Sequence, residues 1–475
     1  MEEIIKERLK RLQALREKGL SQRFLYGHTI REVLTDFKSE RKISTAGRIV
    51  FLRSHGKAVF CDLKDSSGKI QIYIKSDFVG TEDFLLFKYI DIGDILGVEG
   101  ETFLTRTGEP TIKVTKFYLL AKSLRPLPEK WHGLRDIEKR YRHRYLDLIS
   151  NDKIKDVFLM RSRIISFIRS FLDSKGYLEV ETPILHPIPG GATGEPFKTY
   201  HNELNLDLFL RIAPELYLKR LLVAGLPKVY EINKNFRNEG ISTRHSPEFT
   251  MLEVYSAYAT YQDMMELCEE LMSLLAKEIF KKEEINYQGK TIDLKTPWQK
   301  RSFSLTLRER FGISPQDSPE EMIEKLRKKR GVVLKERLTR SQIIKIAEEI
   351  LEEESFYSPV FFVDYFTFLC PLAKTKDDNP NLSERFELFV GGMEIANAYT
   401  ELNDPVEQKE RFLEELKELR VDKLQTIDED FIEALEYGMP PAAGLGIGID
   451  RLVMLFADQP SIRDVILFPL LRPRE

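Results

Sequence analysis

Two strand-like runs that flank a basic loop constrain the fold of this chain more than any other feature. They lie in residues 228–258, KVYEINKNFRNEGISTRHSPEFTMLEVYSAY, and predict an antiparallel hairpin. Successive side chains of a strand point to opposite faces. One face of the returning run therefore carries Phe249, Met251, Glu253 and Tyr255. An aromatic ring, a thioether, an acid and a phenol together are unusual for a plain core.

Three basic side chains accompany this hairpin. Arg237 lies at the edge of the loop, where a hairpin brings it towards the same face, and Arg244 and His245 lie at the loop tip. Arginine forks and basic loops hold phosphates, and Phe249 offers a stacking surface. The pattern indicates an anion bound beside an aromatic ring. Surface ion pairs on a hairpin are the alternative.

A second tight hairpin is predicted in residues 383–404, SERFELFVGGMEIANAYTELND, because a Gly-Gly pair separates two apolar-acidic runs. If Val390 pairs with Met393, Glu387 and Glu394 lie diagonally on one face. Two carboxylates there repel each other unless a cation lies between them. Magnesium that bridges a triphosphate is the natural candidate. Two exposed acids on a sheet are the alternative.

The third pattern is the small-residue run in residues 440–456, PPAAGLGIGIDRLVMLF. It predicts a glycine-rich strand that leads into a helix at Asp450 and Arg451, and such a strand lets the backbone approach a ligand closely. The run matches neither the dinucleotide fingerprint nor the Walker pattern, so neither a Rossmann enzyme nor a P-loop enzyme is supported.

The rest of the chain predicts an α+β protein with several domains. Residues 1–42 have a helical, basic pattern, for which a solvated packing helix and an RNA contact are both open. Short strand-like runs in 43–122 predict a small barrel of about five strands. A segment rich in proline, tryptophan and arginine, 123–150, predicts a linker. Helices and strands mix in 151–475, with a charged helical insertion at about 315–355.

Composition excludes several classes. Lysine plus arginine (73) nearly balances aspartate plus glutamate (76), which is unlike a nonspecific nucleic-acid coat. The three cysteines form no CxxC pair, which argues against zinc and disulfides and predicts buried thiols. No leader and no run of 18 apolar residues is found, so we expect a cytoplasmic protein without a membrane span.

Three segments in order resemble the signature motifs of class II aminoacyl-tRNA synthetases. They are GYLEVETP at 176–183, the FRNEG…RH…EFT segment and GLGIGIDR. The segments GGATGEPFKTYHNEL, RIAPELYLKR, ERFELFVGG and IANAYTELNDP resemble the lysyl members in particular. The likeness runs from about residue 43 to the end. It implies an N-terminal OB-fold barrel and a class II catalytic domain built on an antiparallel sheet flanked by helices.

The resemblance also implies an activity, the ATP-dependent conversion of L-lysine to lysyl-adenylate and its transfer to tRNA(Lys). Phe249 and Arg451 would sandwich the adenine, Arg237 would hold the α-phosphate and the lysine carboxylate, and Glu239 would orient the nucleotide. Arg237 and Arg451 would be the catalytic residues, because this chemistry rests on positioning and charge neutralisation.

By the same likeness, Arg244 and His245 would reach the outer phosphates of ATP. Glu387 and Glu394 would hold Mg²⁺, and Glu387 would also belong to the ATP site. No covalent enzyme intermediate is implied.

The lysine site implied by the resemblance consists of Gly191, Glu215, Arg237, Glu253, Tyr255, Asn397, Tyr399 and Glu401. Glu401 with Tyr255 would take the ε-ammonium, and Glu215 with the backbone near Gly191 would take the α-ammonium. Asn397 would support the carboxylate end. Carboxylates are needed there because a buried ammonium is costly without them.

One conflict predicts a local irregularity. Strict alternation sends Asn397, Tyr399 and Glu401 to the face opposite Glu394, whereas the likeness puts all four in one pocket. We therefore expect a bulge or bend after Glu394.

The barrel resembles the anticodon-binding OB-fold of this subgroup, where aromatic platforms and a basic groove hold unpaired bases. Arg48, Phe60 and Gln71 are the positions carried over, with Phe60 stacking on the central base and Gln71 reading its edge. From the sequence alone, Phe60 could instead be a core residue.

The first motif implies a homodimer with Pro183 and its neighbours at the interface. One departure from the lysyl pattern is Glu195, in Thr193-Gly194-Glu195-Pro196, where the enzymes compared usually carry a basic residue. It casts doubt on an electrostatic role for that position.

Three other readings remain open. Aspartyl and asparaginyl relatives share the barrel and the motifs but need cationic or amide-reading pockets, which Glu215 and Glu401 disfavour. A ligase that attaches lysine to a protein would lack the barrel. A non-catalytic RNA-binding paralogue would have lost Arg237, Glu394 or Arg451, and all three are present.

Overall fold

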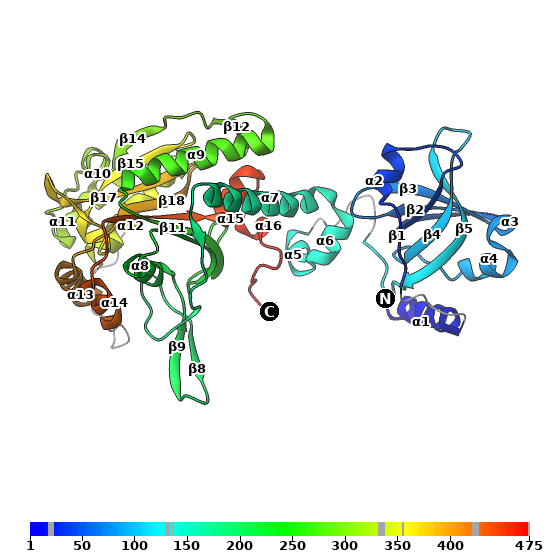
Figure 1. Cartoon of the computed structure of the whole chain (residues 1–475), viewed down its shortest axis with the longest axis horizontal. Coiled ribbons are helices and arrows are strands. Elements are labelled where there is room, and N and C mark those ends of the chain that lie inside the picture. Colours follow the sequence, from blue (N-terminus) through cyan, green and yellow to red (C-terminus); the bar gives the residue numbers. More distant parts are fainter. Residues whose placement is uncertain are drawn as a thin grey trace. The chain divides into compact units, whose positions relative to one another are not determined.

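The computed structural model describes residues 1–17, 23–128, 134, 136–192, 194–330, 338–353, 356–419 and 427–473. The chain divides into two compact units, Met1–Asp136 and Ile137–Glu475 (Figure 1). The division falls inside the 123–150 segment predicted as a linker. Two short helices of that segment, α5 (Ile137–Arg142) and α6 (Arg144–Ser150), belong to the second unit.

The first unit is built on a closed barrel with the strand order β1-β2-β3-β5-β4, which confirms the predicted OB-fold. Its strands are β1 (Lys42–His55), β2 (Ala58–Lys64), β3 (Lys69–Lys75), β4 (Ile95–Leu104) and β5 (Pro110–Ala121). Helices α3 (Ser76–Val79) and α4 (Thr81–Phe87) connect β3 to β4. Burial alternates residue by residue along β2 and β3, so one face of each strand fills the barrel.

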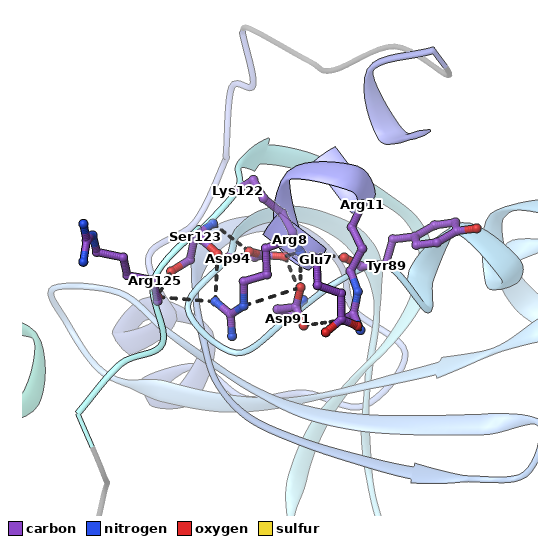
Figure 2. Close-up of polar contacts among 9 residues, drawn as sticks. All are labelled: Glu7, Arg8, Arg11, Tyr89, Asp91, Asp94, Lys122, Ser123 and Arg125. Atoms are coloured by element: carbon purple, nitrogen blue, oxygen red, sulfur yellow. Dashed lines mark hydrogen bonds and ion pairs between the residues drawn. The ribbon is translucent and has the colours of Figure 1, made fainter. Parts of the chain in front are cut away.

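Two helices precede the barrel, α1 (Glu2–Glu17) and α2 (Ile30–Thr35). Figure 2 shows that α1 is held by polar contacts: Arg11 Nη1 donates to the Asp91 carboxylate at 2.6 Å. Arg8 Nη1 donates to the Ser123 carbonyl oxygen at 2.7 Å, and Leu15 is buried in the barrel's core cluster. The face of α1 that carries Arg8, Arg11 and Leu15 therefore packs against the barrel, and both arginines form hydrogen bonds with it.

The second unit is built on a nine-stranded sheet with the order β14-β15-β17-β18-β19-β11-β10-β6, and β16 pairs with β17. The strands are β6 (Leu178–Glu179), β10 (Lys228–Phe236), β11 (Glu248–Ala257), β14 (Gln299–Ser302), β15 (Val360–Phe366), β16 (Thr375–Lys376), β17 (Asn379–Val390), β18 (Met393–Thr400) and β19 (Ala442–Gly448). The pairs β6/β10 and β14/β15 are parallel, and the other pairs are antiparallel. The predicted α+β fold class is confirmed.

Helices pack on this sheet and bury its main core. Those in the largest core cluster are α7 (Asp152–Ser174), α9 (Tyr261–Phe280), α15 (Ile449–Phe456) and α16 (Ile462–Val465). Helix α9 begins where the Asp263 carboxylate accepts the Thr260 backbone N–H at 2.7 Å, and its apolar face supplies Met264, Leu271 and Leu275 to the core. Figure 1 shows α7 and α9 lying along the sheet.

Smaller elements complete the unit. The other helices are α8 (Glu215–Val223), α10 (Phe303–Phe311), α11 (Pro319–Arg330), α12 (Arg340–Glu353), α13 (Pro405–Leu419), α14 (Glu429–Glu436) and the 3₁₀ turn η1 (Thr367–Leu369). The strands β7 (Leu185–His186), β8 (Lys198–His201) and β9 (Leu206–Leu210) form a three-stranded sheet, and β12 (Glu284–Tyr287) pairs with β13 (Lys290–Asp293). Helices α11 and α12 fall in the predicted insertion at about 315–355, of which 331–337 and 354–355 lie outside the described residues.

The tight hairpin β17/β18 has the predicted register and the predicted irregularity. Val390 pairs with Met393, and the next pair places Glu394 opposite Phe389. The register then shifts, so that Leu388 pairs with Ala396. The extra residue after Glu394 is a β-bulge, which confirms the prediction and lets Glu394 and the residues beyond it face one site.

Two further expectations can be compared with the structure. All three cysteines are buried and free, as predicted. In the part of the chain that the structure describes, no helix is long and apolar enough to cross a membrane.

Candidate active site

Two adjoining cavities lie over the middle of the nine-stranded sheet, at β11, β18 and β19. One has a volume of about 360 Å³ and the other about 130 Å³. Both are lined by Arg237, Met251, Glu394, Asn397 and Gly446. A ligand that filled both cavities would therefore pass Arg237 and Glu394.

The smaller cavity collects the basic and aromatic residues predicted for a nucleotide. Its lining includes Glu239, Arg244, His245, Phe249 and Arg451. Phe249 is half-buried on β11, and Arg451 lies in the first turn of α15. Arg451 Nη2 lies 3.4 Å from His245 Nε2. Burial lowers the pKa of His245, and the charges of Arg451 and Lys345 lower it further, so the imidazole favours its neutral form.

Arg237 stands between the cavities and retains hydrogen-bonding capacity. Its guanidinium lies 5.1 Å from the centre of the Phe249 ring. Its buried Nε has no hydrogen-bond partner among the residues that the structure describes. Burial lowers the pKa of Arg237, and the nearby carboxylates of Glu239 and Glu394 oppose that shift. A desolvated guanidinium with a free donor is suited to an anion.

The larger cavity is lined by acids and phenols. Its lining includes Gly191, Glu215, Glu253, Tyr255, Asn397 and Tyr399. Tyr399 Oη donates to Glu215 Oε1 at 2.5 Å, and Tyr255 Oη donates to Glu253 Oε2 at 3.2 Å. Burial, with the charge of Glu215 next, raises the pKa of Glu253 to about 8. The cavity therefore disfavours the ionised form of Glu253, and a cationic ligand would favour it.

Glu401 lies behind this cavity rather than in its lining. It is 1% exposed, and its carboxylate forms an ion pair with Lys219, a residue of α8 that the sequence reasoning did not single out. Lys219 also pairs with Glu215 at 2.7 Å. The sequence does carry one signal for Lys219: it lies four residues after Glu215 on a predicted helix, and this spacing is typical of an ion pair. A Cβ added to Gly444 would collide with Glu401, so this glycine makes room for the carboxylate.

The two acids predicted for a metal have different neighbours. Arg451 Nη1 donates to Glu394 Oε2 at 3.0 Å, and Glu394 lines both cavities. Glu387 is buried, pairs with Arg385 and shares a hydrogen bond with Glu348 of α12. Glu348 is also a residue that sequence reasoning missed, because its insertion helix carries no motif.

A magnesium site fits this donor set. Burial raises the pKa of Glu387, Arg385 opposes the rise, and the charge of Glu394 adds to it, so the two acids repel each other. Among the described residues, no group of three or more histidines, cysteines or acids is arranged as a metal site. Magnesium needs only one or two carboxylates when a substrate supplies phosphate oxygens.

The outer face of the barrel carries a row of aromatic and basic residues. Cross-strand pairing aligns Arg53 with Phe60, Phe60 with Tyr73, and Tyr73 with Lys113. The rings of Phe60 and Tyr73 are stacked with centroids 4.7 Å apart. The core residues of β2 are Val59, Cys61 and Leu63, so the alternative that Phe60 belongs to the core is wrong.

The other two residues expected on the barrel have partners of their own. Gln71 is half-buried, and its Oε1 accepts the Thr111 hydroxyl at 3.0 Å. Arg48 Nη1 donates to the Gly93 carbonyl oxygen at 2.7 Å. Gln71 lies one row from Phe60, since it pairs with Asp62.

The segment that departs from the lysyl pattern borders the site. Gly194 lies against Arg237 and Glu239, whereas the Glu195 side chain is exposed. The Glu195 carbonyl oxygen accepts the Asn238 N–H at 2.7 Å. Thr193 lies outside the described residues.

Comparisons with known proteins agree with this geometry. Residues 136–472 match the family "tRNA synthetases class II (D, K and N)", and residues 43–120 match the "OB-fold nucleic acid binding domain". The chain is 52% identical to the lysine–tRNA ligase of Carboxydothermus hydrogenoformans, over 100% of this chain and 99% of that protein. It is 52% identical to the lysine–tRNA ligase of Pelotomaculum thermopropionicum and 50% identical to that of Thermoanaerobacter pseudethanolicus, with 96% and 97% of those proteins covered. The chain therefore belongs to the lysine–tRNA ligase family of class II aminoacyl-tRNA synthetases.

Proposed function

We propose that this chain activates L-lysine with ATP to give lysyl-adenylate and pyrophosphate, and then transfers the lysyl group to the 3′ end of tRNA(Lys), releasing AMP. The similarity to lysine–tRNA ligases along the whole chain supports these substrates. The observation that carries the proposal is the pair of adjoining cavities, one basic and aromatic, the other acidic, with Arg237 between them. We expect the protein to work in the cytoplasm, where tRNA is charged for translation.

The smaller cavity is the proposed ATP site. Adenine would lie between the Phe249 ring and the Arg451 guanidinium, and Glu239 would orient the nucleotide. Arg244 and His245 would reach the outer phosphates from the loop between β10 and β11. The stacking face of Phe249 and the donors that surround it support these roles.

The larger cavity is the proposed lysine site. Glu401 with Tyr255 would hold the ε-ammonium, and Glu215 with the backbone near Gly191 would hold the α-ammonium. The remaining members of the site would be Arg237, Glu253, Asn397 and Tyr399. The buried acids Glu215 on α8, Glu253 on β11 and Glu401 directly after β18 support a dicationic amino acid over aspartate or asparagine.

The reaction needs positioned charges rather than a protein nucleophile. A lysine carboxylate oxygen would attack the α-phosphorus in line, and the bond to the pyrophosphate oxygen would break. Arg237 would stabilise the charge at the α-phosphate, and its unpartnered Nε supports this role. A ribose hydroxyl of the tRNA would then attack the lysyl carbonyl carbon and expel AMP.

Glu387 and Glu394 would hold Mg²⁺, and Glu387 would belong to the ATP site through that ion. When bound, the ion would neutralise part of the triphosphate charge. The mutual repulsion of the two carboxylates supports this assignment. The hydrogen bond from Arg451 would keep Glu394 directed at the ATP cavity.

The barrel is the proposed anticodon site. Phe60 would stack on the central base, Gln71 would read its edge, and Arg48 would belong to the same site. The support is the aligned row of Arg53, Phe60, Tyr73 and Lys113, because alternating aromatic and basic side chains hold unpaired bases.

We also propose a homodimer whose interface includes Pro183. Large apolar side chains near it in the chain are exposed to solvent, namely Leu178, Ile184, Leu185, Tyr200 and Leu206. So many exposed large apolar groups in one stretch of the chain support a surface that a partner covers. Sedimentation at micromolar concentration should give twice the chain mass of 55.4 kDa, and a monomer would contradict the proposal.

Pyrophosphate exchange assayed with each of the twenty amino acids tests the activity. We expect exchange with lysine alone, followed by lysylation of tRNA(Lys). Exchange with aspartate or asparagine would assign the chain to another member of the class. Lysylation of a protein without lysylation of tRNA would indicate a protein ligase. No exchange with any amino acid would leave RNA binding as the function.

A further inference from the structure

The acidic site contains a lysine that belongs to the protein itself. Lys219 lies on α8, its side chain is fully buried, and its Nζ is 2.7 Å from Glu215 Oε1. The same Nζ forms the ion pair with Glu401, whose side chain is also fully buried. It lies 5.6 Å from the centre of the Tyr399 ring. An ammonium of this protein therefore already contacts both acids proposed to receive the substrate's two ammonium groups.

These contacts leave hydrogen-bonding capacity at the site. Lys219 Nζ and Glu401 Oε2 are close enough for an ion pair, yet Lys219 Nζ and both oxygens of Glu401 have no aligned hydrogen-bond partner among the described residues. A buried carboxylate of this kind can accept a further donor without losing its counter-ion. The space beside it is kept open by Gly444, where a Cβ would also meet the Tyr255 ring at 2.5 Å.

The balance of charges in the lysine site explains why a buried lysine of the protein would be needed there. Three acids enclose the site, Glu215, Glu253 and Glu401, and a buried charge is costly unless it is paired. Lysine brings two ammonium groups, while its carboxylate faces Arg237. The pKa of Glu253 is about 8 in the protein without substrate, and a bound ammonium would lower it, so that Glu253 ionises when lysine binds. Two ammonium groups cannot then neutralise three carboxylates, whereas two together with Lys219 can. An amino acid with a neutral side chain would leave one carboxylate without a partner.

We infer that Lys219 is a specificity-determining positioning residue of the lysine site: it holds Glu215 and Glu401 in place and supplies the third positive charge that balances the three acids when lysine is bound. The inference rests on the proposed function. Lys219 acts through the two carboxylates and does not touch the reacting atoms. The two ammonium groups of the substrate would therefore bind carboxylates that the buried ammonium of Lys219 holds in place.

The pKa of Lys219 agrees with this role. Burial lowers it, but Glu215 and Glu401 together raise it above its ordinary value, so the side chain stays charged. For Glu401, burial raises the pKa and Lys219 opposes the rise. Without Lys219, the pKa of Glu401 would rise further and favour the neutral form, which binds an ammonium poorly.

Kinetics of pyrophosphate exchange test the inference. Lys219→Met keeps most of the side-chain volume and removes the charge, and we expect the lysine KM to rise about tenfold or more, as for loss of one member of a buried ion pair. The ATP KM should change less than about twofold, since Lys219 does not line the ATP cavity. A lysine KM that stays near the wild-type value in Lys219→Met would overturn the inference.

Chemical rescue separates charge from packing. Lys219→Ala removes the atoms of a propylammonium group, so added n-propylamine should lower its lysine KM saturably, whereas 1-propanol should not. Lys219→Met should show no rescue, because its side chain fills the space. Equal effects of the amine and the alcohol on Lys219→Ala would assign Lys219 a purely structural role and overturn the inference.

A double-mutant cycle keeps the test decisive if Lys219→Ala does not fold. In a Glu401→Gln background, Lys219→Met should change the lysine KM far less than it does in the wild type, because its partner is already neutral. Independent, multiplicative effects would contradict action through Glu401. Failure of the proposed function is distinguishable, since the wild-type chain would then show no lysine-dependent exchange at all.

Discussion

Arg451 and Glu394 are joined by a hydrogen bond of 3.0 Å from guanidinium Nη1 to carboxylate Oε2. The same Nη1 donates to the Glu394 carbonyl oxygen at 2.8 Å. One guanidinium therefore fixes both the backbone and the side chain of the residue that precedes the β18 bulge. In the proposed mechanism this contact couples the adenine-stacking arginine to a magnesium ligand.

Glu394→Gln should separate these two roles. The amide keeps an oxygen that can accept from Arg451 but loses the charge that magnesium needs. We expect kcat for pyrophosphate exchange to fall by about 100-fold or more, the size of loss typical when one preorganised charge is removed from a transition state. The magnesium concentration for half-maximal rate should rise, and the lysine KM should change little. An unchanged magnesium dependence would contradict the assignment.

Phe249→Ala tests the adenine platform. Base–aromatic stacking contributes about 1–3 kcal/mol, so the ATP KM should rise about 5- to 150-fold. Phe249→Tyr, which keeps a ring, should stay near the wild-type value and is the matched control. The lysine KM should change little in both variants, because Phe249 lines only the smaller of the two cavities. Equal losses for ATP and lysine would show that Phe249 supports the hairpin rather than the nucleotide.

Local sequence patterns predicted the hairpins of this site well. A Gly-Gly turn admits one register between its flanking strands, so the pairing of Val390 with Met393 followed from the turn alone. The bulge after Glu394 followed from a conflict between strand alternation, which sends Asn397 to the opposite face, and the family resemblance, which puts Glu394 and Asn397 in one pocket. Both features depend on residues within ten positions of each other, where strand geometry decides the outcome.

Contacts between distant segments were not predictable in this way. Lys219 reaches Glu401, and Glu348 reaches Glu387, only after the strands and helices have packed together. The Glu215–Lys219 spacing could have suggested a helical ion pair, but nothing in it indicates complete burial. Residues 315–355 were predicted only as a charged helical insertion, because nothing in the sequence distinguishes Glu348 from the other acids of that segment.

Phe60→Ala tests the barrel face. We expect the KM for tRNA(Lys) in lysylation to rise about 5- to 150-fold, because one stacked base is lost, while pyrophosphate exchange without tRNA stays unchanged. Tyr89→Ala is the matched control, since Tyr89 is an exposed aromatic of the same unit that lies outside the row of Arg53, Phe60, Tyr73 and Lys113. An equal effect of the two substitutions would argue against a stacking role for Phe60.

Glu253 predicts a pH dependence of stability. Its pKa is raised to about 8 in the folded protein, mainly by burial, against an ordinary value of 4.5. The folded state therefore holds this proton more tightly than the unfolded state. The resulting stabilisation is fully present below about pH 4.5, decreases as the pH rises, and is lost above about pH 8.

Glu253→Gln should remove this dependence, because the amide stays neutral at every pH. We expect the Tm of the variant minus that of the wild type to increase from pH 5 to about pH 8 and then to level off. The exposed Glu203→Gln is the control and should give a difference that does not change with pH. A flat difference for Glu253→Gln would mean that the carboxyl is ionised in the folded protein.

Gly444→Ala tests the space behind the lysine site. A Cβ there would collide with Glu401 and lie 2.5 Å from the Tyr255 ring, and both groups are proposed to hold the ε-ammonium. Overpacking of this kind costs about 1–3 kcal/mol, so the lysine KM should rise about 5- to 150-fold at saturating ATP. Gly448→Ala is the control, because its nearest neighbour, Arg451 Cβ, would be 3.8 Å away. A normal lysine KM in Gly444→Ala would show that Glu401 and Tyr255 do not contact the substrate, since neither could keep its position beside the added methyl group.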